Sequence, residues 1–172
     1  MTQAASTIAS QIVPLNDEQM VLPNTAIAEI IDFSQLAAVP SAVRNRPEWL
    51  LGMLAWRGLS VPVIAFETMF GGKYAEPGSR TRLAVLNVVT GVPGVPFIAV
   101  PTRTIPQLMQ IDQSAISVVE EPGEMHPAVA CHVVIAGKTA IIPNLDEIER
   151  QVAETFAMKP PTGTKKKAAK KK

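Results

Sequence analysis

The amino-acid sequence predicts an all-β protein built from small antiparallel barrels, with one α-helix near its C-terminus. Three pairs of short apolar runs, each pair separated by a glycine-containing turn, indicate three β-hairpins. The 172 residues include 15 prolines and 10 glycines, which favour many short elements over long helices. Only one stretch, close to the end of the chain, repeats apolar residues at helical spacing. Short strands that are interrupted this regularly are typical of small barrels.

The central hairpin is predicted for residues 49–66, where two apolar runs flank Arg57-Gly58. Gly58 can take the positive φ that a tight bend requires. Pro62 removes one backbone donor, so its strand should lie at a sheet edge or contain a bulge. Gly52 predicts a bulge or a close approach of another backbone in the facing strand.

Two more hairpins and one helix complete the expected elements. The sequence predicts hairpins from residues 82–89 with 95–100, and from residues 129–135 with 139–142. Single strands are expected at residues 20–22, 26–33 and 116–119. Asn144 is the expected N-cap of the helix, and Glu147 three residues later forms a capping-box pattern with it.

Charge and composition divide the chain into a folded domain and two tails. We expect a flexible N-terminal arm over residues 1–14, a folded domain over 15–158, and a disordered lysine-rich tail over 159–172. Residues 1–158 carry 9 basic and 15 acidic side chains, a net charge of −6, while the tail holds seven lysines. The sequence has a single cysteine and no apolar run of the roughly 18 residues that cross a membrane. With no signal-peptide pattern at the N-terminus, these observations predict a cytoplasmic protein.

Few residues in the sequence could carry chemistry. Cys131 and His132 are neighbours on a predicted strand and so point to opposite faces, which favours a core cysteine and a surface histidine over a metal site. We therefore expect no metal, no cofactor and no catalytic residue. Glu120, Glu121 and Glu124 lie in a Pro/Gly loop and are expected to be solvated. A small β-barrel hydrolase that uses residues 120–132 is the enzymatic alternative, and it requires convergent side chains in a pocket.

The basic tail offers a third class of function. Its last lysines could bind nucleic acid or anionic lipid: Lys165, Lys166, Lys167, Lys170, Lys171 and Lys172. A tail that only improves solubility is an equally good interpretation. No aromatic residue lies among the lysines, so base stacking is excluded.

Arg57 and Glu29 are lone charges in apolar predicted strands. Each would be costly to bury alone, so we expect a buried ion pair between them. Such a pair serves either to specify the fold or to form part of an interface. The stretch 49–66 is also more apolar than one small barrel is expected to cover, which favours an interface.

Residues 52–64, GMLAWRGLSVPVI, resemble the hairpin signature of the CheW family, G-x-x-x-x-R-G-x-x-x-P-V-I. The likeness extends over residues 15–155. It includes MVLP and IAEII within 20–31, PEWLLG at 47–52, RTRLAVLNV at 80–88 and PNLDEI at 143–148. The resemblance implies two small SH3-like β-barrel subdomains followed by a C-terminal helix.

The resemblance also implies a non-catalytic scaffold that couples the cytoplasmic domains of methyl-accepting chemoreceptors to a CheA-type histidine kinase. In this family the arginine of the signature pairs with the glutamate of the E-I strand, near the receptor-contacting groove; here these positions are Arg57 and Glu29. The implied partner-binding residues are Glu29, Trp56, Arg57, Gly58, Val61 and Pro62. Ala55-Trp56 before the arginine, and Ala65-Phe66 after it, depart from the family pattern. These departures favour an accessory adaptor, such as ChpC in the chemosensory pili system that controls twitching motility.

Overall fold

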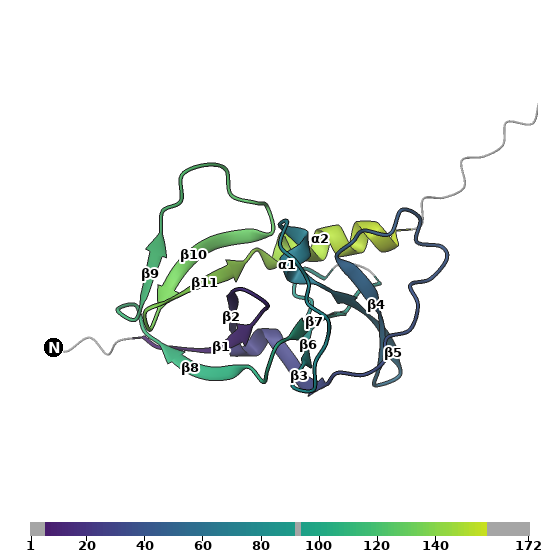
Figure 1. Cartoon of the computed structure of the whole chain (residues 1–172), viewed down its shortest axis with the longest axis horizontal. Helices are drawn as coiled ribbons and strands as arrows, with labels where there is room; N and C mark the ends of the chain where they lie inside the picture. The colour runs from purple at the N-terminus through teal and green to yellow at the C-terminus, as the bar shows by residue number, and fades with distance from the viewer. Residues whose placement is uncertain (1–5, 92–93, 158–172) are drawn as a thin grey trace, which may run out of the picture.

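Two β-sheets stand side by side in the computed structural model, which describes residues 6–91 and 94–157, and a helix lies across them (Figure 1). The first sheet has the pairing order β8 (Gln107–Ile111), β1 (Ile8–Pro14), β2 (Gln19–Pro23), β11 (Lys138–Pro143), β10 (Val129–Ile135) and β9 (Ile116–Val119). The second has the order β3 (Ile27–Asp32), β6 (Arg82–Asn87), β7 (Phe97–Thr102), β5 (Leu59–Ile64) and β4 (Leu50–Trp56). The helices are η1 (Asn24–Ala26), α1 (Phe66–Met69) and α2 (Leu145–Phe156). The predicted all-β class with a C-terminal helix is confirmed.

Each sheet forms one small barrel. The first barrel is built from two separate parts of the chain, and the second barrel is built entirely from the segment between them. Strands β1 and β2 belong to the first sheet, β3 to β7 to the second, and β8 to β11 to the first again. The return is closed by parallel pairing of β2 with β11, at Met20 and Ile141. The first barrel is therefore assembled from both ends of the domain.

The core consists of one cluster shared between the two sheets and one smaller cluster within each barrel. The shared cluster contains Val13 and Met20 from the first sheet, Ile64 from the second, and Ile148 and Val152 from α2. Burial of the same helix face against both sheets fixes the two barrels to one another. The second barrel has its own core of Leu54, Trp56, Val61, Val63, Leu83, Val85 and Ala99. The first has Ile12, Val21, Ile111, Val133, Ile135 and Ala140.

All three predicted hairpins are present. β4 and β5 join at Arg57-Gly58, β6 pairs with β7, and β10 pairs with β11 across Ala136-Gly137. The single strands expected at 20–22, 26–33 and 116–119 are found as β2, β3 and β9. The lysine-rich tail lies outside the described residues.

The N-terminal arm expected over residues 1–14 is wrong from Ile8 onward. Ile8–Pro14 forms β1, which pairs with β2 on one side and with β8 on the other. Ile12 and Val13 are buried, and the small polar residues before them tolerate the extended conformation. β8 was not predicted either, because Pro106 disfavours a helix there without revealing the strand that begins at the next residue.

Pro62 lies neither at a sheet edge nor at a bulge, so both predicted alternatives are wrong. β5 is flanked by β4 and β7, and the register shift of this hairpin lies on β4, between Leu50 and Gly52. Met53 faces Pro62 across the hairpin and exchanges its own backbone hydrogen bonds with Ala37 instead. Met53 and Pro62 are therefore a non-hydrogen-bonded pair, and the proline nitrogen points toward β7. The pairing between β5 and β7 lies at Val63 and Ala99. The missing N–H of Pro62 therefore leaves few hydrogen bonds between these two strands unformed.

Both expectations for Gly52 are met in β4. The register shifts between Leu50 and Gly52, as in a β-bulge. A Cβ atom at Gly52 would lie 2.8 Å from the carbonyl oxygen of Ala37 and 2.9 Å from Cβ of Leu36. The glycine thus allows the loop before β4 to lie against the edge of this strand.

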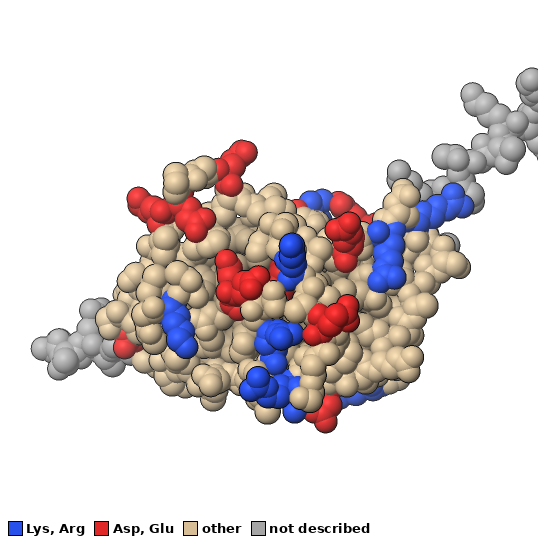
Figure 2. Space-filling model, in the orientation of Figure 1, with Lys and Arg blue, Asp and Glu red and all other residues tan. Residues whose placement is uncertain are grey.

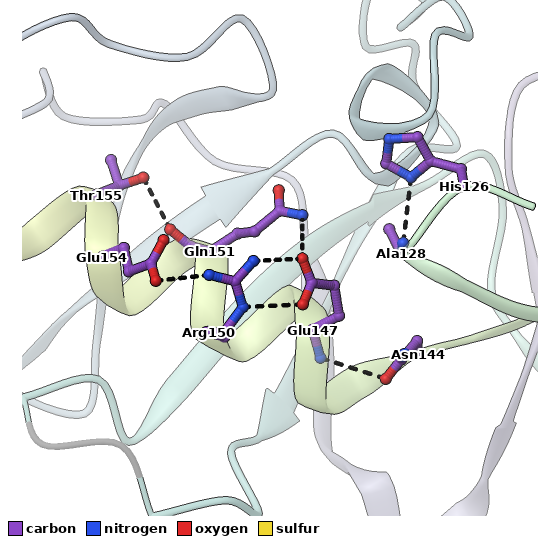
Figure 3. Close-up of polar contacts among 8 residues, drawn as sticks. All are labelled: His126, Ala128, Asn144, Glu147, Arg150, Gln151, Glu154 and Thr155. Carbon is purple, nitrogen blue, oxygen red and sulfur yellow. Dashed lines mark hydrogen bonds and ion pairs between the residues drawn. The ribbon is translucent and has the colours of Figure 1, made fainter.

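Helix α2 begins as predicted at Asn144, whose Oδ1 accepts a hydrogen bond from the Glu147 backbone at 3.3 Å (Figure 3). The second half of the capping box is absent, because the Glu147 carboxylate binds Arg150 and Gln151 instead. These bonds, chiefly from Arg150, lower the pKa of Glu147 to about 2. The backbone N–H of Asn144 donates to Ala128, which ties the helix start to the end of the β9–β10 loop.

Candidate partner-binding site

The tip of the β4–β5 hairpin is a two-residue turn in which both residues have positive φ. The values are 48° at Arg57 and 76° at Gly58. This combination is typical of a type I′ turn, whose twist matches that of the flanking strands. An arginine in the left-handed region is uncommon and carries a small conformational cost. The hairpin therefore holds the Arg57 side chain at a defined point beyond the strand ends.

Glu29 receives two hydrogen bonds from this hairpin. Its Oε2 atom accepts from Nε1 of Trp56 at 2.9 Å and from NH2 of Arg57 at 2.9 Å. Glu29 lies on β3, where the register against β6 shifts between Ile27 and Glu29. The ion pair predicted between Arg57 and Glu29 is therefore present, with the indole of Trp56 as an unpredicted third member.

The Trp56 ring packs against the guanidinium of Arg57. The guanidinium carbon of Arg57 lies 4.7 Å from the ring centroid, within the range of a cation–π interaction. Phe97 on β7 meets the same indole edge to face, with ring centroids 4.8 Å apart. Trp56 thus joins the exposed arginine to the core of the second barrel. The sequence predicted the strand that carries Phe97, but its contact with Trp56 was missed because it depends on how that strand lies against the hairpin in the fold.

The predicted burial of the ion pair is wrong. The side chain of Arg57 is 67% exposed and that of Glu29 is 38% exposed. The two long side chains therefore meet at the surface of the barrel and not within it. An exposed pair of this kind contributes about 0–1 kcal/mol to stability. Its position leaves the charges available to another molecule.

The other implied contact residues divide by exposure. Gly58 is exposed at the turn, whereas Trp56, Val61 and Pro62 are buried. The fold also covers most of the stretch 49–66, so the expected excess of exposed apolar surface there is wrong. Leu59 is the large apolar side chain of the hairpin that stays exposed.

A second candidate surface lies on the first barrel. β8 and β9 are the two ends of its sheet and are not paired with each other, although only a short turn joins them. Large apolar side chains are exposed on these strands and beside them: Ile8, Leu108, Val118 and Met125. We call this the open-edge surface. It was not foreseen because β1 and β8 were not predicted.

The loop between β9 and β10 carries the acidic residues weighed for the hydrolase alternative. It projects from the first barrel, and Figure 2 shows acidic side chains gathered over it. Glu120, Glu121 and Glu124 are exposed, as expected. Glu121 approaches Nδ1 of His132 at 3.2 Å, over a depression that Glu124 also lines. Within residues 6–91 and 94–157 no group of three or more histidine, cysteine or acidic side chains could hold a metal ion.

Cys131 is half-buried and packs beside the core of the first barrel, while His132 is also half-buried. As neighbours on β10, the two side chains point to opposite faces of the strand. Among the helices of the described part of the chain, none is long and apolar enough to span a membrane.

Two SH3-like barrels fixed by one helix, with an exposed charge pair at a hairpin tip and an unpaired sheet end, define a two-barrel β protein. The family model for the CheW-like domain matches residues 11–153, and the chain belongs to this family. The family comprises scaffold proteins of chemotaxis signalling. A comparison with curated proteins gives no match.

Among solved structures, the chain is similar to the scaffolding protein TtCheW from Thermoanaerobacter tengcongensis. The TM-score is 0.65 and the sequence identity 17%, and the match covers 81% of this chain and 90% of TtCheW. At this identity the likeness is one of fold, and it includes both SH3-like barrels.

Proposed function

We propose that this protein is a cytoplasmic, non-catalytic adaptor that couples a chemoreceptor to a CheA-type histidine kinase in a membrane-associated receptor array. The observation that carries the proposal is the exposed Arg57–Glu29 pair, which a rigid turn and an aromatic ring hold at the tip of a hairpin. A surface ion pair adds little stability, whereas oriented charges fix the register of a partner.

The receptor contact in this proposal consists of exposed groups at the hairpin tip: Glu29, Arg57, Gly58 and Leu59. Trp56, Val61 and Pro62 are buried, so they act by holding the hairpin in place and not by direct contact. This assignment keeps three of the six residues that the family resemblance implied as direct contacts, and it adds Leu59.

The kinase contact in this proposal is the open-edge surface. An unpaired strand end offers backbone groups for strand addition, and neighbouring apolar side chains supply area to bury. Two surfaces on different barrels would let one molecule bind both partners at once. A more specific form of this proposal is that the protein is an accessory adaptor of a chemosensory pili system, similar to ChpC.

The test is a binding measurement with purified receptor cytoplasmic fragments and CheA-type kinases of the same organism. Arg57→Ala should weaken receptor binding about tenfold or more and leave kinase binding unchanged. Arg80→Ala removes an exposed arginine away from the hairpin and is the matched control. Equal receptor binding by wild type and R57A, with both proteins folded by circular dichroism, would refute the receptor contact.

For the kinase, Val118→Ser should weaken binding while leaving receptor binding intact. Val89→Ser is the matched control, because Val89 is 65% exposed and Val118 is 69% exposed. Equal losses in both variants would exclude the open-edge surface as the kinase contact.

A further inference from the structure

The Glu29 carboxylate uses only one of its oxygens within the described part of the protein. Both donors, from Trp56 and Arg57, bind Oε2, and no described residue donates to Oε1. Every buried side-chain oxygen or nitrogen of the described, non-exposed residues has a hydrogen-bond partner. Glu29 is one of these residues, so its unpartnered Oε1 must reach solvent. A free acceptor therefore lies at the hairpin tip.

A free donor lies beside it. Arg57 uses NH2 for Glu29, while Nε and NH1 have no described partner and the side chain is 67% exposed. One face of the guanidinium is covered by the Trp56 ring, so its remaining N–H groups are directed along its edge. The tip thus presents a donor and an acceptor side by side, with no net charge.

This arrangement selects the partner by chemistry. A partner carboxylate would bind Arg57 but would be repelled by the Glu29 carboxylate. A partner cation would bind Glu29 but would be repelled by the Arg57 guanidinium. A primary amide satisfies both sites, because its oxygen accepts from Arg57 while its NH2 group donates to Oε1 of Glu29. We propose that the Trp56–Arg57–Glu29 cluster binds a side-chain carboxamide, from an asparagine or glutamine, on the receptor. This inference rests on the proposed receptor contact.

Trp56 is a positioning residue in this site. Its N–H fixes one oxygen of Glu29, and its ring fixes the plane of the Arg57 guanidinium. Both groups are therefore oriented before the partner arrives, which reduces the entropy lost on binding. A leucine at this position could supply neither interaction.

The experiment uses the full-length protein and receptor cytoplasmic fragments in which each exposed Asn or Gln of the fragment is changed singly to Asp or Glu. These changes preserve shape and replace an NH2 donor with a charged acceptor. At the receptor position that contacts the cluster, the change should weaken binding of the fragment to the wild-type adaptor about tenfold, equivalent to about 1.4 kcal/mol. The E29Q variant should restore binding to that changed fragment, because it removes the opposing charge and adds an amide donor.

Asp32→Asn is the matched control, since Asp32 is an exposed carboxylate on the same strand that pairs with Arg82. It should not restore binding. The indole N–H resonance of Trp56, assigned with the W49F variant, should shift when the unchanged fragment binds and shift less with the weakened one. Fragments that bind equally well after every substitution, or an E29Q variant that restores nothing, would overturn the carboxamide assignment alone. Failure of all fragments to bind wild type would overturn the receptor contact and this inference together.

Discussion

Replacing Glu149 with alanine should weaken the attachment of helix α2 to the second barrel and lower stability substantially. Glu149 is only 3% exposed, although it carries a carboxylate. It accepts hydrogen bonds from the backbone of Val89 at 2.9 Å, from the backbone of Thr90 at 2.9 Å and from the Thr90 hydroxyl. It is thus the polar link between the helix and the segment that follows β6.

The expected loss follows from these bonds. Each net hydrogen bond contributes roughly 1 kcal/mol, and the three donors that E149A leaves behind lie in partly buried positions. We expect the free energy of unfolding to fall by about 3 kcal/mol. For a domain of this size that corresponds to a decrease in Tm of about 6–12 °C.

Urea unfolding, followed by circular dichroism, measures this loss directly. With a typical slope of about 2 kcal/mol/M, the midpoint should fall by about 1.5 M. Glu154→Ala is the control, since Glu154 is exposed on the same helix and pairs with Arg150 at the surface. It should change stability by less than about 0.5 kcal/mol. If E149A lost less than about 1 kcal/mol, the link would not be what holds the helix to the barrel.

Three further outcomes are expected. Gly52→Ala should cost about 1–3 kcal/mol in denaturant unfolding, because its Cβ would meet the Ala37 carbonyl, while Gly78→Ala, with nothing within 4 Å, should be near neutral or stabilising. Burial, with help from Glu76 and Glu67, raises the pKa of Tyr74 to about 12. It is the only tyrosine, so ultraviolet absorbance should show a single phenol that titrates near pH 12 when folded and near pH 10 when unfolded, with stability falling across that interval. The Arg150 bond lowers the pKa of Glu147 to about 2, so its stabilising contribution should be complete above about pH 4.5 and be lost toward pH 2. An acid-unfolding profile of Glu147→Gln identical to wild type would contradict this.

The hairpin at Arg57 was predictable because local chemistry determines it. A glycine at the bend and apolar residues on both sides specify a tight turn regardless of the rest of the fold. The same holds for the α2 start, where Asn144 caps its own helix. The pairing of Arg57 with Glu29 was also predicted, since both were lone charges in apolar strands.

The exposure of that pair was not predictable, because it depends on how β3 and the hairpin lie relative to each other in the folded barrel. β1 and β8 were missed for a related reason. Each is stabilised mainly by its partners, as β1 pairs with β2 and β8, and neither has a strong alternation of its own. The hydrogen bond from Trp56 to Glu29 joins residues on separate strands, and no local pattern encodes it.

The path of the chain has a consequence for the order of folding. Every strand of the second barrel lies between Ile27 and Thr102, so its ladder can form while the remainder of the chain is still being synthesised. The first barrel must bring Met20 beside Ile141, a contact of long sequence separation that forms slowly. We expect the hairpin of β1 and β2 to remain incompletely paired until the last strands emerge from the ribosome.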